Sequence, residues 1–143
     1  MKPNNLVVLA LIVALLMGCG AEEEPAHAKN CLESMPEAIS GLAVSGARSE
    51  KNVIANLWPL ACRAQELYRD RLLENPDLKK GTVELKLAVE FNGEIISIAI
   101  ARNTVADAAF EKKLLNLLAF MDFDPYGAHN TESDILFPMH FKP

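Results

Sequence analysis

The chain has 143 residues, which is the length of one domain of ordinary size. It carries 19 acidic and 14 basic residues, a formal net charge of −5, and its lysines and arginines form no cluster. Because nucleic-acid binding depends on basic side chains that neutralise phosphates, this balance argues against a nucleic-acid partner and against polybasic attachment to anionic lipid.

The N-terminus has the pattern of a secretory signal. Lys2 precedes an apolar run of 11 residues, 6–16, whereas a membrane-spanning helix needs about 20. The sequence Leu16-Met17-Gly18-Cys19 makes this segment resemble a bacterial lipoprotein signal. The resemblance implies that residues 1–18 are removed and that Cys19 becomes the lipidated, palmitate-bearing first residue of the mature chain. An ordinary secretory peptide that contains a cysteine is the alternative.

Two cysteines remain once Cys19 is assigned to lipid. Cys31 and Cys62 form an even pair in a compartment that permits disulfides. A bridge between them would close a loop of about 30 residues and stabilise the fold by roughly 3 kcal/mol. Two free buried thiols remain the alternative, because the sequence does not place their Cβ atoms.

Residues 19–48 are charged and interrupted by proline and glycine, which predicts a tether. A flexible tether of about 30 residues reaches only about 30 Å, so the domain at residues 49–143 is expected to work near its membrane. Helical spacing of apolar residues then predicts a first helix from residue 49 that ends at Asn75-Pro76, with Pro59 as a kink or the start of its second half.

Strand patterns follow the first helix. Alternation over residues 82–91 predicts a strand, Asn92-Gly93 a hairpin turn, and residues 94–102 the return strand. The inward row of that return strand is predicted to be Ile96, Ile98 and Ile100. A second helix is predicted up to Met121, with Thr104 or Asp107 as its N-cap, and a last strand over residues 135–141.

This order of elements predicts an α+β fold. A helical crossover joins parallel strands, so the third strand should lie beside the first. The expected architecture is a three-stranded antiparallel sheet in the order 2-1-3, with two helices packed on one face.

The pieces of this pattern resemble a known family, the TonB-like C-terminal domain of the AgmX/PglI type. The resemblance covers roughly residues 50–142 and rests on the order and spacing of these residues: Cys62, Tyr68, Leu72, Asn75-Pro76-Asp77-Leu78, Gly81-Thr82-Val83, Asn92-Gly93-Glu94-Ile95, Phe110-Glu111, Phe123 and Phe137-Pro138-Met139-His140-Phe141. It implies a non-enzymatic domain that grips periplasmic partner proteins, commonly by pairing a sheet edge with an extended segment. A lipid signal in place of a membrane helix, and the absence of a long proline-rich spacer, argue against energy transduction to outer-membrane receptors.

The predicted partner-binding site is the edge of the last strand. It comprises Ser133, Asp134, Ile135, Leu136 and Phe137. Pro138 fits an edge strand because proline cannot donate to a ladder, and the remaining edge groups could accept a partner strand. The return strand, residues 94–102, is the other predicted open edge, and both edges also permit a homodimer by edge pairing.

One polar cluster could hold a cation. It consists of Asp122, Asp124, His129, Asp134 and His140. A solvated acidic loop explains the same residues more simply, so the sequence predicts no metal, no cofactor and no catalytic residue. It contains no nucleophile elbow, phosphate-cradling glycine loop or zinc helix.

The sequence thus predicts a lipid-anchored, non-catalytic adaptor that binds an envelope protein. Gly20 after the lipidated cysteine favours the outer membrane, facing the periplasm, over the inner membrane, by what such signals imply in many Gram-negative species. The alternative is a structural envelope lipoprotein that contacts peptidoglycan or another wall polymer.

Overall fold

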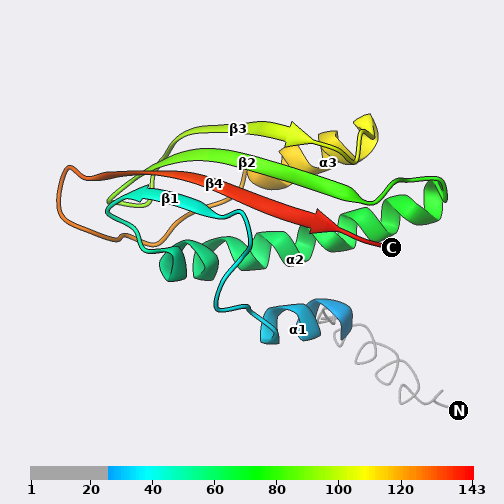
Figure 1. Cartoon of the computed structure of the whole chain (residues 1–143), viewed down its shortest axis with the longest axis horizontal. Helices are drawn as coiled ribbons and strands as arrows, with labels where there is room; N and C mark the ends of the chain where they lie inside the picture. The colour runs from blue at the N-terminus through cyan, green and yellow to red at the C-terminus, as the bar shows by residue number, and fades with distance from the viewer. Residues whose placement is uncertain (1–25) are drawn as a thin grey trace, which may run out of the picture.

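The computed structural model describes residues 26–143, so the predicted signal peptide and Cys19 lie outside the described residues. The elements in chain order are α1 (Ala26–Glu33), β1 (Ala43–Gly46), α2 (Glu50–Glu74), β2 (Gly81–Glu90), β3 (Ile95–Asn103), α3 (Ala108–Leu118) and β4 (Glu132–Phe141). The strands form one antiparallel sheet in the order β1-β4-β2-β3, with α2 and α3 packed on one face (Figure 1). None of the helices from residue 26 onward is both long and apolar enough to cross a membrane.

The prediction of a three-stranded sheet with two helices is wrong, although the fold is still mixed α+β. β2 pairs with β3 on one side and with β4 on the other, and a fourth strand, β1, lies beyond β4. Both β1 and the additional helix α1 come from residues assigned to the tether. A strand of four residues that ends in Gly46 is too short for its alternation to be recognised in the sequence. It forms because it can pair with the edge of β4.

Helices α2 and α3 each begin after a residue whose side chain caps the first turn. Ser49 Oγ accepts a hydrogen bond from the backbone nitrogen of Asn52 (3.2 Å) at the start of α2. Asp107 Oδ1 accepts one from the backbone nitrogen of Phe110 (2.8 Å) at the start of α3, which confirms Asp107 as a cap. α2 continues through Pro59 and ends before Pro76, as the backbone restriction ahead of proline favours.

The core lies between the two helices and the central strands. An aromatic group joins α2, α3 and β4: the Tyr68 ring lies 5.8 Å from Phe110 and 5.4 Å from Phe141, and those two rings are 5.0 Å apart. Alternate residues of β2, from Val83 to Val89, complete this core. Burial raises the pKa of the Tyr68 hydroxyl, which has no hydrogen-bond partner within residues 26–143.

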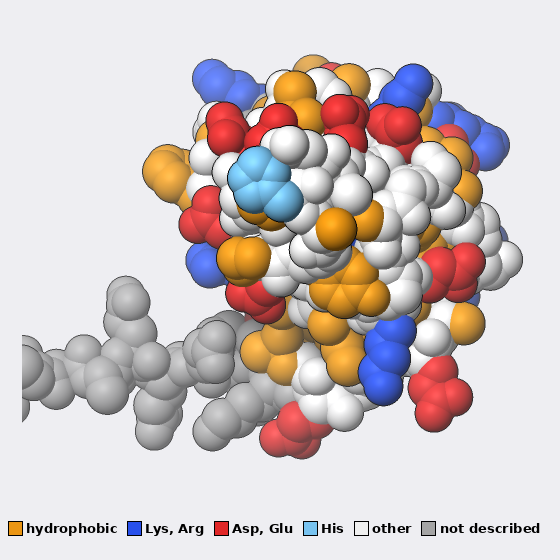
Figure 2. All heavy atoms as spheres, turned by 90° about the vertical axis from the view of Figure 1, so that its left-hand side faces the viewer, with side chains coloured by type: hydrophobic (Ala, Val, Ile, Leu, Met, Phe, Trp, Pro, Cys, Tyr) orange, Lys and Arg blue, Asp and Glu red, His pale blue; other side chains and the backbone are white. Residues whose placement is uncertain are grey.

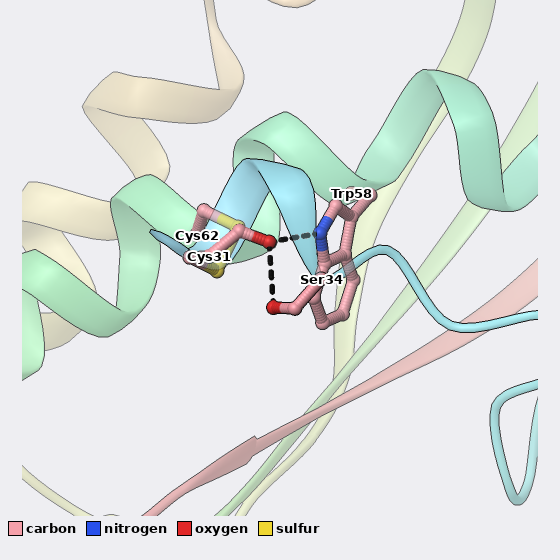
Figure 3. The surroundings of a disulfide bond; sticks show 4 residues. All are labelled: Cys31, Ser34, Trp58 and Cys62. Atoms are coloured by element: carbon pink, nitrogen blue, oxygen red, sulfur yellow. Dashed lines mark hydrogen bonds between the residues drawn. A yellow bond between two sulfur atoms is a disulfide. The ribbon is translucent and has the colours of Figure 1, made fainter. Parts of the chain in front are cut away.

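The disulfide prediction is confirmed. Cys31 of α1 is bonded to Cys62 of α2, with Cα atoms 5.7 Å apart. The carbonyl oxygen of Cys31 also accepts a hydrogen bond from Trp58 Nε1 (2.8 Å), so the end of α1 is fixed against α2 at two points, and a local hydrogen bond from Ser34 Oγ (3.0 Å) reaches the same oxygen (Figure 3). The N-terminal arm, residues 26–46, is therefore part of the folded domain.

Candidate protein-binding edges

The predicted binding edge on β4 is covered by β1. Ser133, Asp134, Ile135 and Leu136 lie opposite Gly46, Ser45, Val44 and Ala43 in an antiparallel ladder. The side chains of Ser133, Ile135 and Phe137 are buried, and Leu136 is half-buried. The expectation that this edge is open is therefore wrong, because β1 already takes the hydrogen-bonding groups that a partner strand would need.

Gly46 allows β1 to end where it does. Its φ is +101°, and a Cβ atom at this position would collide with the carbonyl oxygen of Glu132. Immediately afterwards the backbone nitrogen of Arg48 donates to Ser133 Oγ at 2.9 Å, which ties the chain to the start of β4. These contacts hold one end of the N-terminal arm on the sheet, and the disulfide holds the other end on α2.

Arg48 is a buried cation that joins three segments. Only 4% of its surface is exposed, and its guanidinium donates to Asn52 Oδ1 (2.8 Å) and to the carbonyl oxygens of Asp124 (2.8 Å) and Glu90 (3.2 Å). Its charged group also lies 5.0 Å from the centre of the Phe123 ring. Burial lowers the pKa of Arg48, while the nearby Asp124 raises it. No sequence motif marks this residue.

A pair of hydrogen bonds between charged side chains fixes the start of α3 to the end of α2. Arg71 Nε and one terminal nitrogen donate to the two carboxylate oxygens of Asp107, at 2.9 and 3.1 Å. These hydrogen bonds, with that from the backbone of Phe110, lower the pKa of Asp107 to about 2. The bidentate contact orients α3 beneath β2 and β3 and has a structural role.

The predicted acidic cluster is not brought together. His140 lies near the end of β4, where its Nδ1 is 2.9 Å from Thr82 Oγ1, whereas His129 stacks on Phe91 in the loop at the opposite end of that strand, with ring centres 4.7 Å apart. That loop is docked on the β2–β3 hairpin, because the carbonyl oxygen of Phe91 accepts from the backbone nitrogen of Tyr126 (2.7 Å). Figure 2 shows this end of the molecule, where acidic side chains gather along one rim. Across residues 26–143 no three His, Cys, Asp or Glu side chains are placed to share a metal ion.

An apolar groove of about 330 Å³ lies between the N-terminal arm and the end of β4. Ile39 of the arm, Trp58 of α2, and Phe137, Met139 and Phe141 of β4 are among its walls. The groove exists because β1 stops at Leu136 in the ladder, so the last five residues of β4 have no strand beside them on this side.

β3 is the long open edge of the sheet. It has nine residues, none of them proline, and pairs only with β2. Its one charged side chain, Arg102, lies 3.7 Å from Glu84 on the neighbouring strand. Register shifts opposite Leu85 and Val89 mark two bulges, and residues 97–100 between them pair regularly. Natural edges are usually protected by charge, proline or bulges, and β3 has two bulges, one charged residue and no proline.

The predicted inward row of β3 is only partly correct. Ile98 lies opposite Leu87 and Ile100 opposite Leu85, so both face the helices, but the bulge near Val89 places Ile95 in the position expected for Ile96. Ile100 and Ile95 pack against the core, whereas Ile96 and Ile98 remain exposed. The bulge is a property of the pairing and leaves no mark in the alternating sequence.

Comparison of the chain with protein-family models, with curated proteins and with solved structures finds no match. The resemblance to TonB-like domains therefore stays a prediction from the sequence pattern. The geometry itself offers a long open strand edge at β3 and an apolar groove beside the end of β4.

Proposed function

We propose that this protein is a membrane-anchored periplasmic lipoprotein that acts as a non-catalytic binding module. It binds an envelope protein by adding an extended segment of that partner to the β3 edge. The observation that carries the proposal is the open, proline-free, nearly uncharged edge of nine residues.

The side chains of β3 suit an incoming strand. Ser97 and Ala99, which lie opposite Ala88 and Lys86 on the face away from the helices, are small and exposed. A partner strand can therefore approach the backbone of residues 97–100 without moving large side chains. Main-chain hydrogen bonds would supply affinity, and the isoleucines on the helix face would select apolar side chains at alternate positions of the partner.

The proposed anchor keeps the domain close to a membrane. α1 begins at Ala26, seven positions after Cys19. Seven extended residues span at most about 25 Å. A domain that starts so near its lipid would bind partners at or just above the membrane, in keeping with an accessory of an envelope complex at the outer membrane.

Photo-crosslinking in living cells tests the proposal. Probes at Ser97 and Ala99 sample the β3 edge, and probes at Ala43 and Ser45 sample the β1 edge as matched exposed positions. We expect discrete adducts with another protein from the β3 probes only. Adducts from the β1 probes alone would contradict the assignment of β3. No protein adduct from either edge would overturn strand addition and favour the wall-polymer alternative.

A further inference from the structure

An apolar strip lies along β3 and α3. Its four members are large, exposed side chains: two from β3, one from α3 and one from just after the end of α3. They are Ile96 (49% exposed), Ile98 (39%), Leu115 (46%) and Phe120 (87%). Isolated exposed apolar side chains are ordinary on a protein surface, but several of them on and next to an unpaired strand edge indicate an interface.

The lengths of the two elements explain why the strip is uncovered. α3 has 11 residues, or about 16 Å, whereas β3 has nine, or about 30 Å. The helix follows the end of β3 after a short connection and runs back beneath the sheet (Figure 1). It therefore covers the last half of β3, and leaves Ile96 and Ile98 beyond its end.

The side of α3 that faces this edge is set by one hydrogen bond. Asn103 Nδ2 at the end of β3 donates to Glu111 Oε2 of α3 at 2.7 Å. Leu115 is one helical turn further on and lies on the same side of the helix. Phe120 follows just after the helix ends.

We infer that the occupant of this surface is a second copy of the chain, paired antiparallel through β3 with Ile98 opposite Ile98. Directly opposed residues of an antiparallel pair share a face. In this register Ile96 lies alongside Ile100 of the second copy, and Ser97 lies opposite its Ala99. Ile98 thus meets Ile98 on the helix face, and the small residues Ser97 and Ala99 meet on the other face.

Charge favours the same register. Counting outward from Ile98, Arg102 comes alongside Glu94 of the second copy, once at each end of the paired segment. A register centred on Ala99 would instead bring Arg102 beside Ile96. The two-fold axis of an Ile98-centred pair is perpendicular to the sheet, so both copies present their helices on one side, and Leu115 and Phe120 of each copy face the strip of the other.

This inference rests on the proposed function in one respect, that β3 accepts an added strand. It names the occupant that covers β3 when no other partner is bound. A partner segment would then compete with the second copy for the same edge.

Single cysteine substitutions in the full-length, membrane-attached chain test the register. Opposed Cα atoms of an antiparallel pair lie about 4.5 to 5.5 Å apart, which a disulfide can span. Ile98→Cys is expected to give a disulfide-linked homodimer on a non-reducing gel. Ala99→Cys and Ser45→Cys, both exposed, are expected to give at least tenfold less of it. Co-expressing Ser97→Cys with Ala99→Cys should restore the linked product.

Charge reversal provides a second test that keeps the fold intact. Glu94 is exposed in the hairpin, and Glu94→Lys is expected to weaken dimerisation about tenfold, measured as a dissociation constant by light scattering in detergent. Arg102→Glu in the same chain should restore it. Unchanged thermal unfolding would show that each variant remains folded.

The outcomes separate the two proposals. A monomer at all concentrations, or linkage stronger at Ala99 than at Ile98, overturns the inference. If β3 probes in cells still capture another protein while no homodimer forms, the inference is overturned and the proposed function stands. If Ile98→Cys gives the disulfide-linked homodimer and the β3 probes capture no other protein, the homodimer is supported and the adaptor function is overturned.

Discussion

At the scale of single residues, the fold depends on a few buried polar contacts. Arg48 is the most consequential, because its guanidinium bridges the start of α2, the end of β2 and the loop before β4. A hydrogen bond to a charged group is worth more than a neutral one, and removing the donor takes away the Arg48 hydrogen bonds to Asn52 and to the carbonyl oxygens of Glu90 and Asp124.

Arg48→Met should lower the free energy of unfolding by about 3 kcal/mol, because three hydrogen bonds are lost and methionine supplies no donor. Urea denaturation followed by circular dichroism measures the change. Arg63→Met, on the exposed face of α2, is the matched control and should stay within about 0.5 kcal/mol of wild type. Equal effects at the two positions would show that the Arg48 contacts are unimportant.

The lowered pKa of Asp107 predicts how the stability of the fold changes in acid. Its pKa falls to about 2 in the folded protein, from an ordinary value of 3.8, chiefly through its hydrogen bonds with Arg71. A carboxylate with a lowered folded pKa stabilises the fold above its unfolded pKa, and this contribution is lost as the pH falls from about 4 to about 2.

Asp107→Asn should therefore lower the melting temperature at pH 7 and reduce the fall in melting temperature between pH 4.5 and pH 2, relative to wild type. Asparagine can still cap α3 but cannot hold the Arg71 charge. Differential scanning fluorimetry across that range measures both effects, with Asp70→Asn on the exposed face of α2 as control. Parallel pH curves for Asp107→Asn and wild type would contradict the prediction.

In the β2–β3 hairpin the backbone of Gly93 lies close to the backbone of Phe123. The φ of Gly93 is +93°, and a Cβ atom would collide with the carbonyl oxygen of Phe123. Gly93→Ala should cost about 2 to 3 kcal/mol of folding free energy, since backbone strain and a steric clash add. Gly41→Ala is the matched control: its φ is +86° but the nearest atom, Cγ of Pro138, is 3.4 Å from the Cβ position. It should cost only about 1 kcal/mol.

At the scale of elements, the N-terminal arm determines which edge of the sheet is open. The arm adds β1 to β4 and is fixed by the Cys31–Cys62 bond. Without it, the groove beside β4 would lose one wall and the β4 edge would become available.

The variant Cys31→Ala/Cys62→Ala should lose roughly 3 to 4 kcal/mol of stability in the chain-entropy model for a loop of 31 residues. Urea denaturation with and without reductant measures it: reductant should destabilise wild type to the level of the variant and leave the variant unchanged. Limited proteolysis should cut between residues 33 and 42 sooner in the variant. Equal stability with and without reductant in wild type would show that the bridge contributes nothing.

At the scale of the whole molecule, the proposed function joins a lipid anchor to an open strand edge. Cys19→Ser should abolish labelling by an alkyne-bearing fatty acid and release the protein from the membrane fraction, because the acyl chains supply the membrane affinity. Gly20→Ala is a neighbouring control that keeps the acceptor cysteine and should be labelled. Labelling of Cys19→Ser at the wild-type level would contradict lipidation at this cysteine.

The sequence predicted the elements whose signals are local. The apolar spacing of α2 and α3, the alternation of β2 and β4, the Asn92-Gly93 hairpin and the Asp107 cap all appear in the structure. These features depend on contacts between residues a few positions apart. The spacing of apolar residues or a single capping or turn residue is therefore enough to predict them. The Cys31–Cys62 bridge was predicted because the assignment of Cys19 to lipid leaves an even pair of cysteines in a compartment that permits disulfides, which needs no geometry.

Tertiary structure alone decided which strand edge is open. β1 lies opposite residues about 90 positions later in the chain, and its four residues carry no period of their own. Its pairing closes the β4 edge predicted for binding, while the bulges of β3 and the short length of α3 leave Ile96 and Ile98 exposed. The position of the buried Arg48 is of the same kind, since its partners come from three separate segments. An edge, a bulge and a buried charge are defined by what lies beside them in space, and that neighbour is chosen by long-range pairing which local sequence does not encode.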